Sequence, residues 1–198
     1  MAQLAFDLPI RAALRRADFF PSPANASALA ALDAGGWPQG KLLLIGPAGS
    51  GKTHLAHIWA ADHGATLMEG AALAQADIEA RATAPVALEQ ASDVAGDPRA
   101  EAALFHLHNR LAERGLPFLI TARTPPRDWG LRLPDLLSRM QGTSLTRIEA
   151  PDDALLSAVL VKQFADRQLT VPPALIDWLM LRMDRSLAAA RDLVARLD

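Results

Sequence analysis

The octapeptide from Gly46 to Thr53 constrains the fold of this chain more than any other part of its sequence. It matches the pattern G-x-x-x-x-G-K-[ST] at every fixed position. The apolar run 41–45 before it predicts a buried strand, and the stretch 54–61 after it predicts a helix. In such a unit, backbone N–H groups and the helix N-terminus converge on phosphate oxygens. The sequence therefore predicts an α/β core that binds a nucleotide; the alternative is a glycine-rich turn without a ligand.

This loop, called the P-loop below, supplies most of the expected nucleotide contacts. The predicted nucleotide-binding residues are Gly46, Pro47, Ala48, Gly49, Ser50, Gly51, Lys52, Thr53 and the adjoining His54. Lys52 is expected to reach the β- and γ-phosphates, and the Thr53 hydroxyl to help hold Mg²⁺. The expected cofactors are therefore ADP or ATP, together with Mg²⁺.

The charge balance and the residue composition exclude several classes of protein. The 198 residues include 20 Lys and Arg against 22 Asp and Glu, without a long basic run, so we expect no direct sequence-specific binding of nucleic acid. The absence of Cys excludes disulfides and thiolate metal sites. No apolar run reaches the length of a membrane span, and the N-terminus lacks the pattern of a signal peptide. We therefore expect a soluble, cytoplasmic protein that does not enter a membrane.

Strands and helices are predicted to alternate as far as residue 148. Expected strands after the first are 65–68, 85–89, 116–121 and 143–148. Expected helices besides the one after the P-loop are a short one from Asn25 or Ser27 to about Leu32, then 71–82, 98–114 with Asp97 as N-cap, and 134–140. This alternation predicts a parallel sheet with helices on both faces. From Pro151 the pattern changes to three helices, 152–167, 172–183 and 187–197.

A P-loop α/β core followed by a small helical lid is the layout of the AAA+ ATPases, and this chain resembles their DnaA branch. The segment 18–25 is similar to the family's segment beside the adenine, which implies a nucleotide contact for Phe20. The segment 103–111 resembles the helix after Walker B, 120–126 the sensor 1 strand, and 133–140 the arginine-finger box. The resemblance implies three parts: an N-terminal segment 1–25, an AAA+ core 26–150 and a three-helix lid 151–198. It ends where DnaA continues into a DNA-binding domain.

The residues expected to support hydrolysis depart from the family pattern. Glu89 stands where P-loop ATPases usually have the Asp that orders Mg²⁺, and Gln90 replaces the acid that orients water. We expect Glu89 to reach Mg²⁺ through water, with tight nucleotide binding and slow intrinsic hydrolysis. The alternative is that Glu89 only ends a strand.

The two sensor positions also differ from the family. Arg123 occupies sensor 1, where it is expected either to contact phosphate or to face solvent. Ala188 stands where DnaA carries its sensor 2 arginine. Arg185 or Arg191 is expected to substitute for that arginine; the alternative for both is a solvated helix face.

The resemblance gives Arg139 a role in another protein's site. It implies an arginine finger that acts in trans and stabilises charge on a γ-phosphoryl group held by a neighbour. A solvated surface arginine is the alternative.

The N-terminal peptide is similar to the short peptides that dock replication proteins on the sliding clamp. Gln3 is expected to hydrogen-bond at a pocket rim, while Leu4, Phe6 and Leu8 anchor in an apolar groove. A loose apolar tail that covers the core is the alternative.

Other residues receive structural interpretations. His54 and His57 share a helix face, but no third ligand is placed near them, so we expect no zinc site. Trp59 and Trp178 are expected in the core, and Trp129 over the loop before the finger helix.

The resemblance as a whole implies a negative regulator of replication initiation. With the DNA-loaded sliding clamp (the DNA polymerase III β subunit), it would stimulate hydrolysis of DnaA-bound ATP; its own ATPase activity would be weak or absent. Head-to-tail assembly is common among AAA+ proteins, which makes a homodimer one expectation. The alternatives are an autonomous ATPase or helicase loader, and a protein that sequesters DnaA without stimulating hydrolysis.

Overall fold

One parallel sheet organises the described part of the chain. The computed structural model describes residue 16 and residues 19–197. Within them the strands are β1 (Lys41–Ile45), β2 (Thr66–Glu69), β3 (Val86–Glu89), β4 (Phe118–Ala122) and β5 (Ser144–Arg147). Their order across the sheet is β2-β3-β4-β1-β5, and every pair is parallel. The predicted parallel sheet is confirmed.

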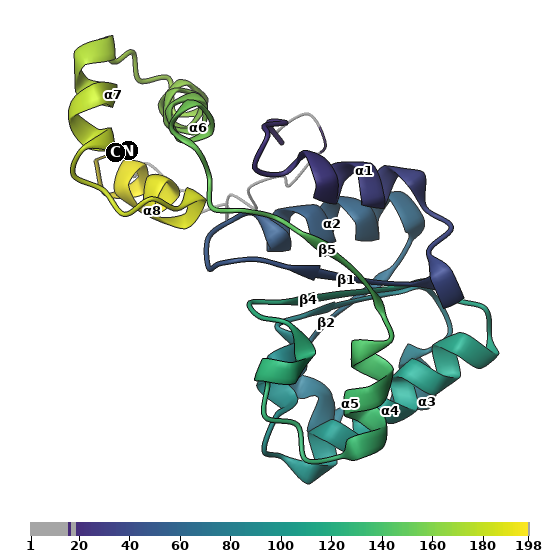
Figure 1. Ribbon diagram of the computed structural model, residues 1–198. Coiled ribbons are helices and arrows are strands. Elements are labelled where there is room, and N and C mark those ends of the chain that lie inside the picture. The colour runs from purple at the N-terminus through teal and green to yellow at the C-terminus, as the bar shows by residue number, and fades with distance from the viewer. Residues whose placement is uncertain (1–15, 17–18, 198) are drawn as a thin grey trace, which may run out of the picture.

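Helices cover both faces of this sheet (Figure 1). Their bounds are α1 (Ala26–Ala34), α2 (Lys52–His63), α3 (Ile78–Arg81), α4 (Pro98–Glu113), α5 (Pro134–Gln141), α6 (Asp153–Asp166), α7 (Pro173–Met180) and α8 (Leu187–Leu197). The short 3-10 turns are η2 (Pro38–Gly40), η3 (Gly70–Gln75), η4 (Ala91–Val94) and η5 (Pro126–Asp128). Helices α1 and α2 lie on one face, and α3, α4 and α5 lie on the other.

The burial of the strands explains their composition. Every residue of β1, β3 and β4 is buried, because helices cover both of their faces, and these strands are therefore almost continuously apolar. Alternate residues of β1 enter opposite cores: Leu42 and Leu44 pack toward α1 and α2, whereas Leu43 and Ile45 pack toward α4. The outer strands β2 and β5 instead alternate between half-buried and exposed positions.

The long helix α4 begins as its sequence predicts. Asp97 is the N-cap, and its Oδ1 accepts hydrogen bonds from the backbone N–H groups of Arg99 at 2.8 Å and Ala100 at 3.4 Å. Pro98 occupies the first turn, where its missing N–H leaves no bond unmade.

The expectation of one continuous helix over 71–82 is wrong. The chain forms the 3-10 turn η3, becomes extended at Ala76, and restarts as the short helix α3. Asp77 explains the break: its side chain accepts a hydrogen bond from the Ala80 N–H at 3.1 Å, so Asp77 caps a new helix instead of continuing the previous one.

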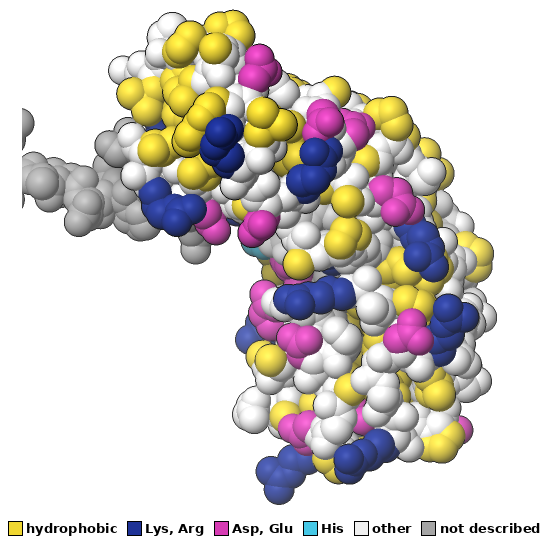
Figure 2. Space-filling view, turned by 60° about the vertical axis from the view of Figure 1, so that its left-hand side comes forward, with side chains coloured by type: hydrophobic (Ala, Val, Ile, Leu, Met, Phe, Trp, Pro, Cys, Tyr) yellow, Lys and Arg dark blue, Asp and Glu magenta, His cyan; other side chains and the backbone are white. Residues whose placement is uncertain are grey.

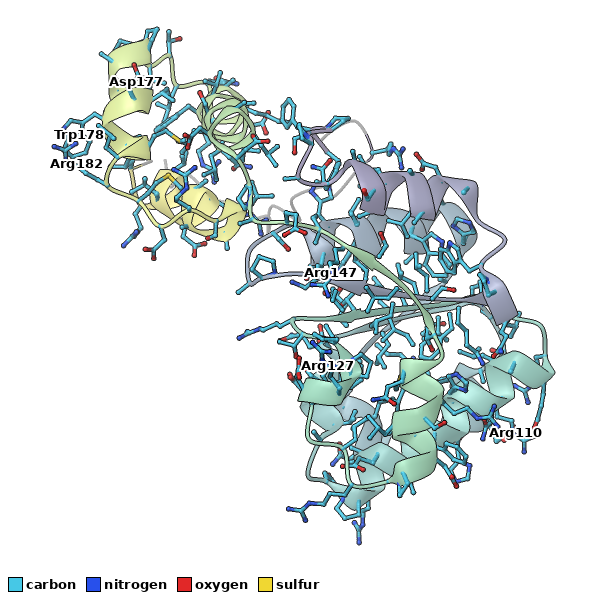
Figure 3. All side chains as sticks on the ribbon, viewed as in Figure 1. Arg110, Arg127, Arg147, Asp177, Trp178 and Arg182 are labelled. Atoms are coloured by element: carbon cyan, nitrogen blue, oxygen red, sulfur yellow. The ribbon has the colours of Figure 1, made fainter. Side chains whose placement is uncertain are left out.

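Helices α6, α7 and α8 form the lid, which has an apolar core of its own. Its buried residues are Leu160, Phe164, Ile176, Leu179, Ala190 and Val194. The expectation that Trp178 is buried is wrong. Trp178 lies between Ile176 and Leu179 on α7 but faces away from both, and 52% of it is exposed. The Arg182 guanidinium lies 4.3 Å from the centroid of its ring, at the outer side of the lid (Figure 3).

The other two tryptophans with predicted positions lie as expected, Trp59 in the core and Trp129 over the loop before α5. Trp59 is 4% exposed and packs in the core between α2 and the sheet. Trp129 is 7% exposed, and its Nε1 donates a hydrogen bond to the Thr124 carbonyl oxygen at 2.7 Å in the loop that leads to α5. Among the described helices, none has both the length and the apolar character that crossing a membrane requires.

Candidate nucleotide-binding site

The P-loop connects the end of β1 to the start of α2. Because all strands are parallel, their carboxyl ends share one edge of the sheet, where ligands of open α/β sheets commonly bind. Glu89 ends β3 and Arg123 follows β4 at this same edge. The topology therefore places the P-loop beside the residues predicted for Walker B and sensor 1.

Two P-loop glycines lie where a side chain has no room. A Cβ on Gly46 would lie 2.3 Å from the Ile148 carbonyl oxygen, just after β5. A Cβ on Gly49 would lie 2.6 Å from the Ser186 Cβ, and Gly49 also has a φ of +69°, which L-residues rarely adopt. The loop is thus enclosed by the end of the sheet on one side and by the lid on the other.

Lys52 is the first residue of α2 and is half-buried. Its Nζ donates to the carbonyl oxygens of Gly46 at 2.8 Å and Pro47 at 2.7 Å. Burial and the Arg123 charge together lower the pKa of Lys52 to about 8, with Glu89 partly opposing them. The positive charges of Lys52 and Arg123 favour an anion at the P-loop.

Ser50 is a further polar group of the loop. It is 2% exposed, and its Oγ has no hydrogen-bond partner among the described residues. A buried hydroxyl without a partner costs free energy that an incoming acceptor would offset. A phosphate oxygen fits that requirement.

Thr53 and Glu89 are in direct contact. The Thr53 Oγ1 donates to Glu89 Oε2 at 2.5 Å, and Glu89 Oε1 lies 3.1 Å from His57 Nε2. Glu89 is only 4% exposed. A hydroxyl and a carboxylate are the hard oxygen donors that Mg²⁺ prefers, so these two residues fit that metal.

Gln90 is directed away from this cluster. It has a φ of +51°, and its backbone N–H donates to Thr121 Oγ1 at 3.2 Å. Its side-chain Nε2 donates to Glu69 Oε2 on β2 at 3.3 Å. The residue next to Glu89 is therefore bound to the neighbouring strand.

The lid meets the P-loop through the start of α8. The Leu187 N–H donates to the Gly49 carbonyl oxygen at 2.8 Å, while Ser186 Oγ caps α8 by accepting from the Ala189 N–H at 3.0 Å. The Ala188 Cβ lies 3.4 Å from the position that a Cβ on Gly49 would take. The surface is hollowed where lid and core meet (Figure 2).

The two arginines suggested as sensor 2 substitutes are on the lid. Arg185 forms an ion pair with Asp153 of α6, and Arg191 is exposed on α8. Ala188, at the position where the family has its sensor 2 arginine, lies near Gly49 beside Ser186 and Leu187 and brings no charge.

The aromatic contact with the P-loop region comes from Phe19, which the sequence did not single out. Its ring meets the His54 ring edge to face at 5.3 Å, and it lies close to Gly51. Phe20, the expected residue, is half-buried, and its carbonyl oxygen accepts from Asn25 Nδ2 at 2.9 Å. In the sequence, two adjacent phenylalanines at 19–20 indicate an aromatic contact with the P-loop region. Only the structure shows that Phe19 makes the contact with His54.

Arg139 lies apart from the P-loop. It is exposed near the end of α5, which precedes β5 and so approaches the amino ends of the strands. The buried Glu101 holds the start of α5 in place. Its carboxylate accepts from the backbone N–H groups of Gly96 at 3.0 Å, Arg132 at 2.9 Å and Leu133 at 2.8 Å.

Two buried basic groups lie at the same edge of the sheet as Arg139. Lys41 Nζ is 3.3 Å from His108 Nδ1, and each residue is 2% exposed. Burial lowers the pKa of Lys41 to about 8, with a contribution from the Arg139 charge. Burial and the Lys41 charge lower the pKa of His108 to about 4.

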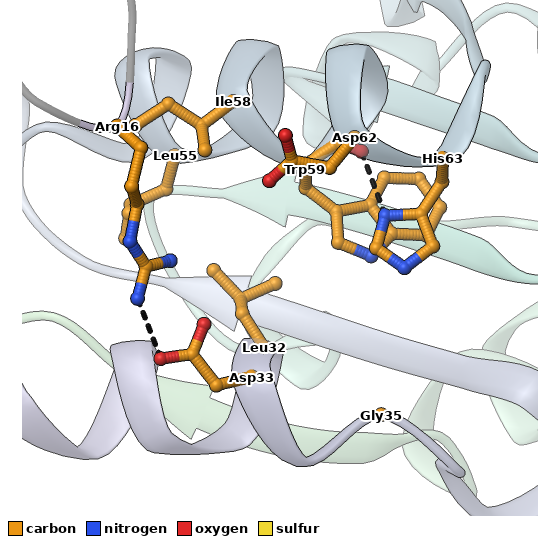
Figure 4. Close-up of a pocket in the computed structure, with 9 residues that line it drawn as sticks. All are labelled: Arg16, Leu32, Asp33, Gly35, Leu55, Ile58, Trp59, Asp62 and His63. Carbon is orange, nitrogen blue, oxygen red and sulfur yellow. Dashed lines mark hydrogen bonds and ion pairs between the residues drawn. The ribbon is translucent and has the colours of Figure 1, made fainter.

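A cavity of about 180 Å³ lies between α1 and α2 (Figure 4). It is lined by Arg16, Leu32, Asp33, Gly35, Leu55, Ile58, Trp59, Asp62 and His63. Arg16 Nη2 donates to Asp33 Oδ2 at 2.6 Å across it. The cavity contains none of the predicted site residues. The expected clamp-binding residues Gln3, Leu4, Phe6 and Leu8 lie outside the described part of the chain.

No protein-family model matches the sequence. Among solved structures, domain III of the replication initiation protein DnaA from Thermotoga maritima superposes with a TM-score of 0.78 at 18% identity, covering 96% of this chain and 89% of that one. AMPPCP-bound DnaA from Aquifex aeolicus gives 0.75 at 17%, covering 90% of this chain and 63% of that one. A RuvB variant from Thermotoga maritima gives 0.65 at 20%, covering 90% and 62%.

These likenesses concern the fold. The chain spans 62–63% of the length of three replication initiation proteins that it matches, two of them DnaA. Its parallel sheet, P-loop and following lid agree with the sequence resemblance. The chain has the α/β fold of the DnaA AAA+ domain, with a five-stranded parallel sheet flanked by helices.

Proposed function

We propose that this protein is a nucleotide-binding regulator related to Hda, the regulatory inactivator of DnaA. Together with the DNA-loaded sliding clamp, it promotes hydrolysis of ATP on DnaA through Arg139. The observation that carries this proposal is the exposed Arg139 on α5 of a DnaA-like core, remote from the chain's own P-loop. An arginine so placed is available to the nucleotide site of another protein.

The nucleotide itself is the first element of the proposal. The P-loop backbone, Lys52 and the unpartnered Ser50 hydroxyl would hold the phosphates, and Thr53 with Glu89 would hold Mg²⁺. Bound Mg²⁺ would neutralise phosphate charge. A structurally similar DnaA binds AMPPCP, which supports nucleotide binding by this chain.

The chain's own hydrolysis is proposed to be weak. Positioning the attacking water requires a group beside the Walker B carboxylate. Gln90 stands there, carries no charge, and donates its amide to Glu69. The nucleotide would then serve chiefly to hold the P-loop and the lid in one arrangement.

Arg139 would supply what DnaA needs in trans. An arginine finger stabilises charge on the transferring phosphoryl group and contributes roughly 10³–10⁵ to the rate. The backbone hydrogen bonds from Arg132 and Leu133 to Glu101 fix the start of its helix. The N-terminal peptide, Gln3 to Leu8, would raise the local concentration of the protein at the clamp.

The test follows the decay of DnaA-bound ATP to ADP with this protein, with and without DNA-loaded clamp. Acceleration that needs the clamp is expected for the wild type. It should be lost in Arg139→Ala and in Gln3→Ala/Leu4→Ala, but kept in Arg127→Ala, which removes an exposed arginine from η5.

Other outcomes identify the alternatives. Robust turnover without DnaA or clamp would indicate an autonomous ATPase or helicase loader. Binding of DnaA that survives Arg139→Ala, with no acceleration by the wild type, would indicate sequestration. Absence of any effect of the wild-type protein on DnaA would refute the proposal.

A further inference from the structure

The carboxylate of Glu89 is held at both of its oxygens. Thr53 Oγ1 donates to Oε2 at 2.5 Å, and His57 Nε2 lies 3.1 Å from Oε1. With Glu89 only 4% exposed, few water molecules can replace either partner. A buried carboxylate without such partners is strongly unfavourable, so both contacts matter.

The two partners belong to one face of α2. Thr53 and His57 are four residues apart in this helix, so their side chains lie on one face, one turn apart. The P-loop fixes the start of α2, and the sheet fixes the end of β3. His57 thus approaches Glu89 from the same rigid helix that carries the P-loop threonine.

A glutamate needs this second partner more than an aspartate would. Its additional rotatable bond gives the carboxylate more orientations, and each must be restricted for a fixed position. Thr53 restrains one oxygen only. His57 restrains the other and thereby fixes the plane of the carboxylate.

The hydrogen bond between Thr53 and Glu89 also orients the hydroxyl. A threonine hydroxyl has one proton and two lone pairs. Its proton is given to Glu89, so its lone pairs are free for a cation. A residue that fixes the position of the Glu89 carboxylate therefore also fixes the direction of the lone pairs on Thr53 Oγ1.

We infer that His57 is a positioning residue for the Mg²⁺ of the nucleotide site: it holds Glu89 Oε1 so that Glu89 Oε2 and Thr53 keep the metal-binding arrangement. This inference rests on the proposed nucleotide binding. His57 acts through Glu89 and contacts neither nucleotide nor metal itself. Its loss should weaken the contribution of Mg²⁺ and leave the phosphate contacts of the P-loop unchanged.

The experiment measures the affinity of the full chain for a fluorescent ADP analogue, mant-ADP, in Mg²⁺ and in EDTA. The proteins are the wild type, His57→Ala, His57→Gln, and His106→Ala as an exposed control on α4. Losing a residue that orients a metal ligand typically costs 10–100-fold in metal affinity. His57→Ala should therefore bind roughly 10-fold more weakly in Mg²⁺ and equally well in EDTA.

His57→Gln provides the rescue, because its amide can still donate to Glu89. It should recover most of the Mg²⁺-dependent affinity, and His106→Ala should match the wild type. Thermal unfolding of each variant separates a folding defect from a metal effect.

Two results would overturn the inference while leaving nucleotide binding intact. One is an equal loss of affinity in Mg²⁺ and in EDTA, and the other is His57→Ala binding like the wild type in both. A wild type that binds no mant-ADP in either condition would overturn the proposed nucleotide binding, and this inference with it.

Discussion

The backbone N–H of Leu187 donates a hydrogen bond to the carbonyl oxygen of Gly49 at 2.8 Å. This bond joins the first residue of the last lid helix to the middle of the P-loop. Beside it, the Ser186 side chain fills the space that a Cβ on Gly49 would need. We therefore expect a displacement of the P-loop at Gly49 to displace the start of α8 as well.

Gly49→Ala is expected to displace the lid. The new Cβ would lie 2.6 Å from the Ser186 Cβ, and the φ of +69° itself costs about 1–2 kcal/mol for a non-glycine residue. Hydrogen exchange at Leu187 should accelerate, and affinity for ADP should fall. Gly115→Ala, with a φ of +63° and no atom within 4 Å of its Cβ, carries the backbone strain alone. Equal exchange at Leu187 in both variants would contradict the prediction.

Lys52→Met should abolish most of the nucleotide affinity. Charge-assisted hydrogen bonds contribute about 1.5–3 kcal/mol each, so the Kd for ADP should rise roughly 10- to 150-fold. Isothermal titration calorimetry measures this directly. Lys162→Met on α6, where the Nζ pairs with Asp166, is the matched control and should bind like the wild type. Comparable binding by both variants would count against the P-loop site.

Stability should depend on pH through His108. Its folded pKa of about 4 lies below the ordinary value of 6.5, so the unfolded chain binds a proton that the folded protein excludes. Unfolding therefore becomes easier as the pH falls from 6.5 toward 4, by at most about 2 kcal/mol between pH 7 and pH 5.

Urea unfolding of His108→Gln at the two pH values tests this origin. Glutamine keeps an acceptor for Lys41 Nζ but does not titrate, so the variant should lose less stability than the wild type on acidification. His106→Gln, exposed on the same helix, should behave like the wild type. Parallel losses in all three proteins would exclude His108 as the cause.

Glu101→Gln should destabilise the protein by about 2 kcal/mol. Three backbone N–H groups share the Glu101 carboxylate, and an amide offers them only one oxygen. The loop before α5 would loosen, and stimulation of DnaA through Arg139 should fall as well. Denaturant unfolding provides the first measurement. Glu113→Gln, on the exposed end of the same helix, should stay within about 0.5 kcal/mol of the wild type.

Most of the fold could be predicted from local sequence patterns. The strand 41–45, the P-loop and the capped start of α4 depend on neighbouring residues, so their sequence was sufficient. The parallel sheet followed from the alternation of strands and helices. The sequence does not predict the break at Asp77, because an Asp in an apolar helical stretch can either face solvent within one helix or cap the start of a new one. The hydrogen bond from the Ala80 N–H shows that Asp77 is a cap.

Contacts between distant segments could not be predicted. The meeting of Gly49 with Ser186 joins residues from opposite halves of the chain, and no periodicity relates them. Trp178 was misplaced for a similar reason. Its helix α7 has apolar residues on several sides, and only packing against the other lid helices selects Ile176 and Leu179 as the buried ones.

The exposed position of Trp178 gives the lid an optical signature. Trp37, Trp59 and Trp129 are at most 9% exposed, whereas Trp178 is 52% exposed. A collisional quencher such as acrylamide would quench the fluorescence of Trp178 far more efficiently than that of the three buried tryptophans. Tryptophan emission therefore divides into a shielded fraction from the α/β core and an accessible fraction from α7. The natural chain thus carries its own reporter of lid contacts, and no dye has to be attached.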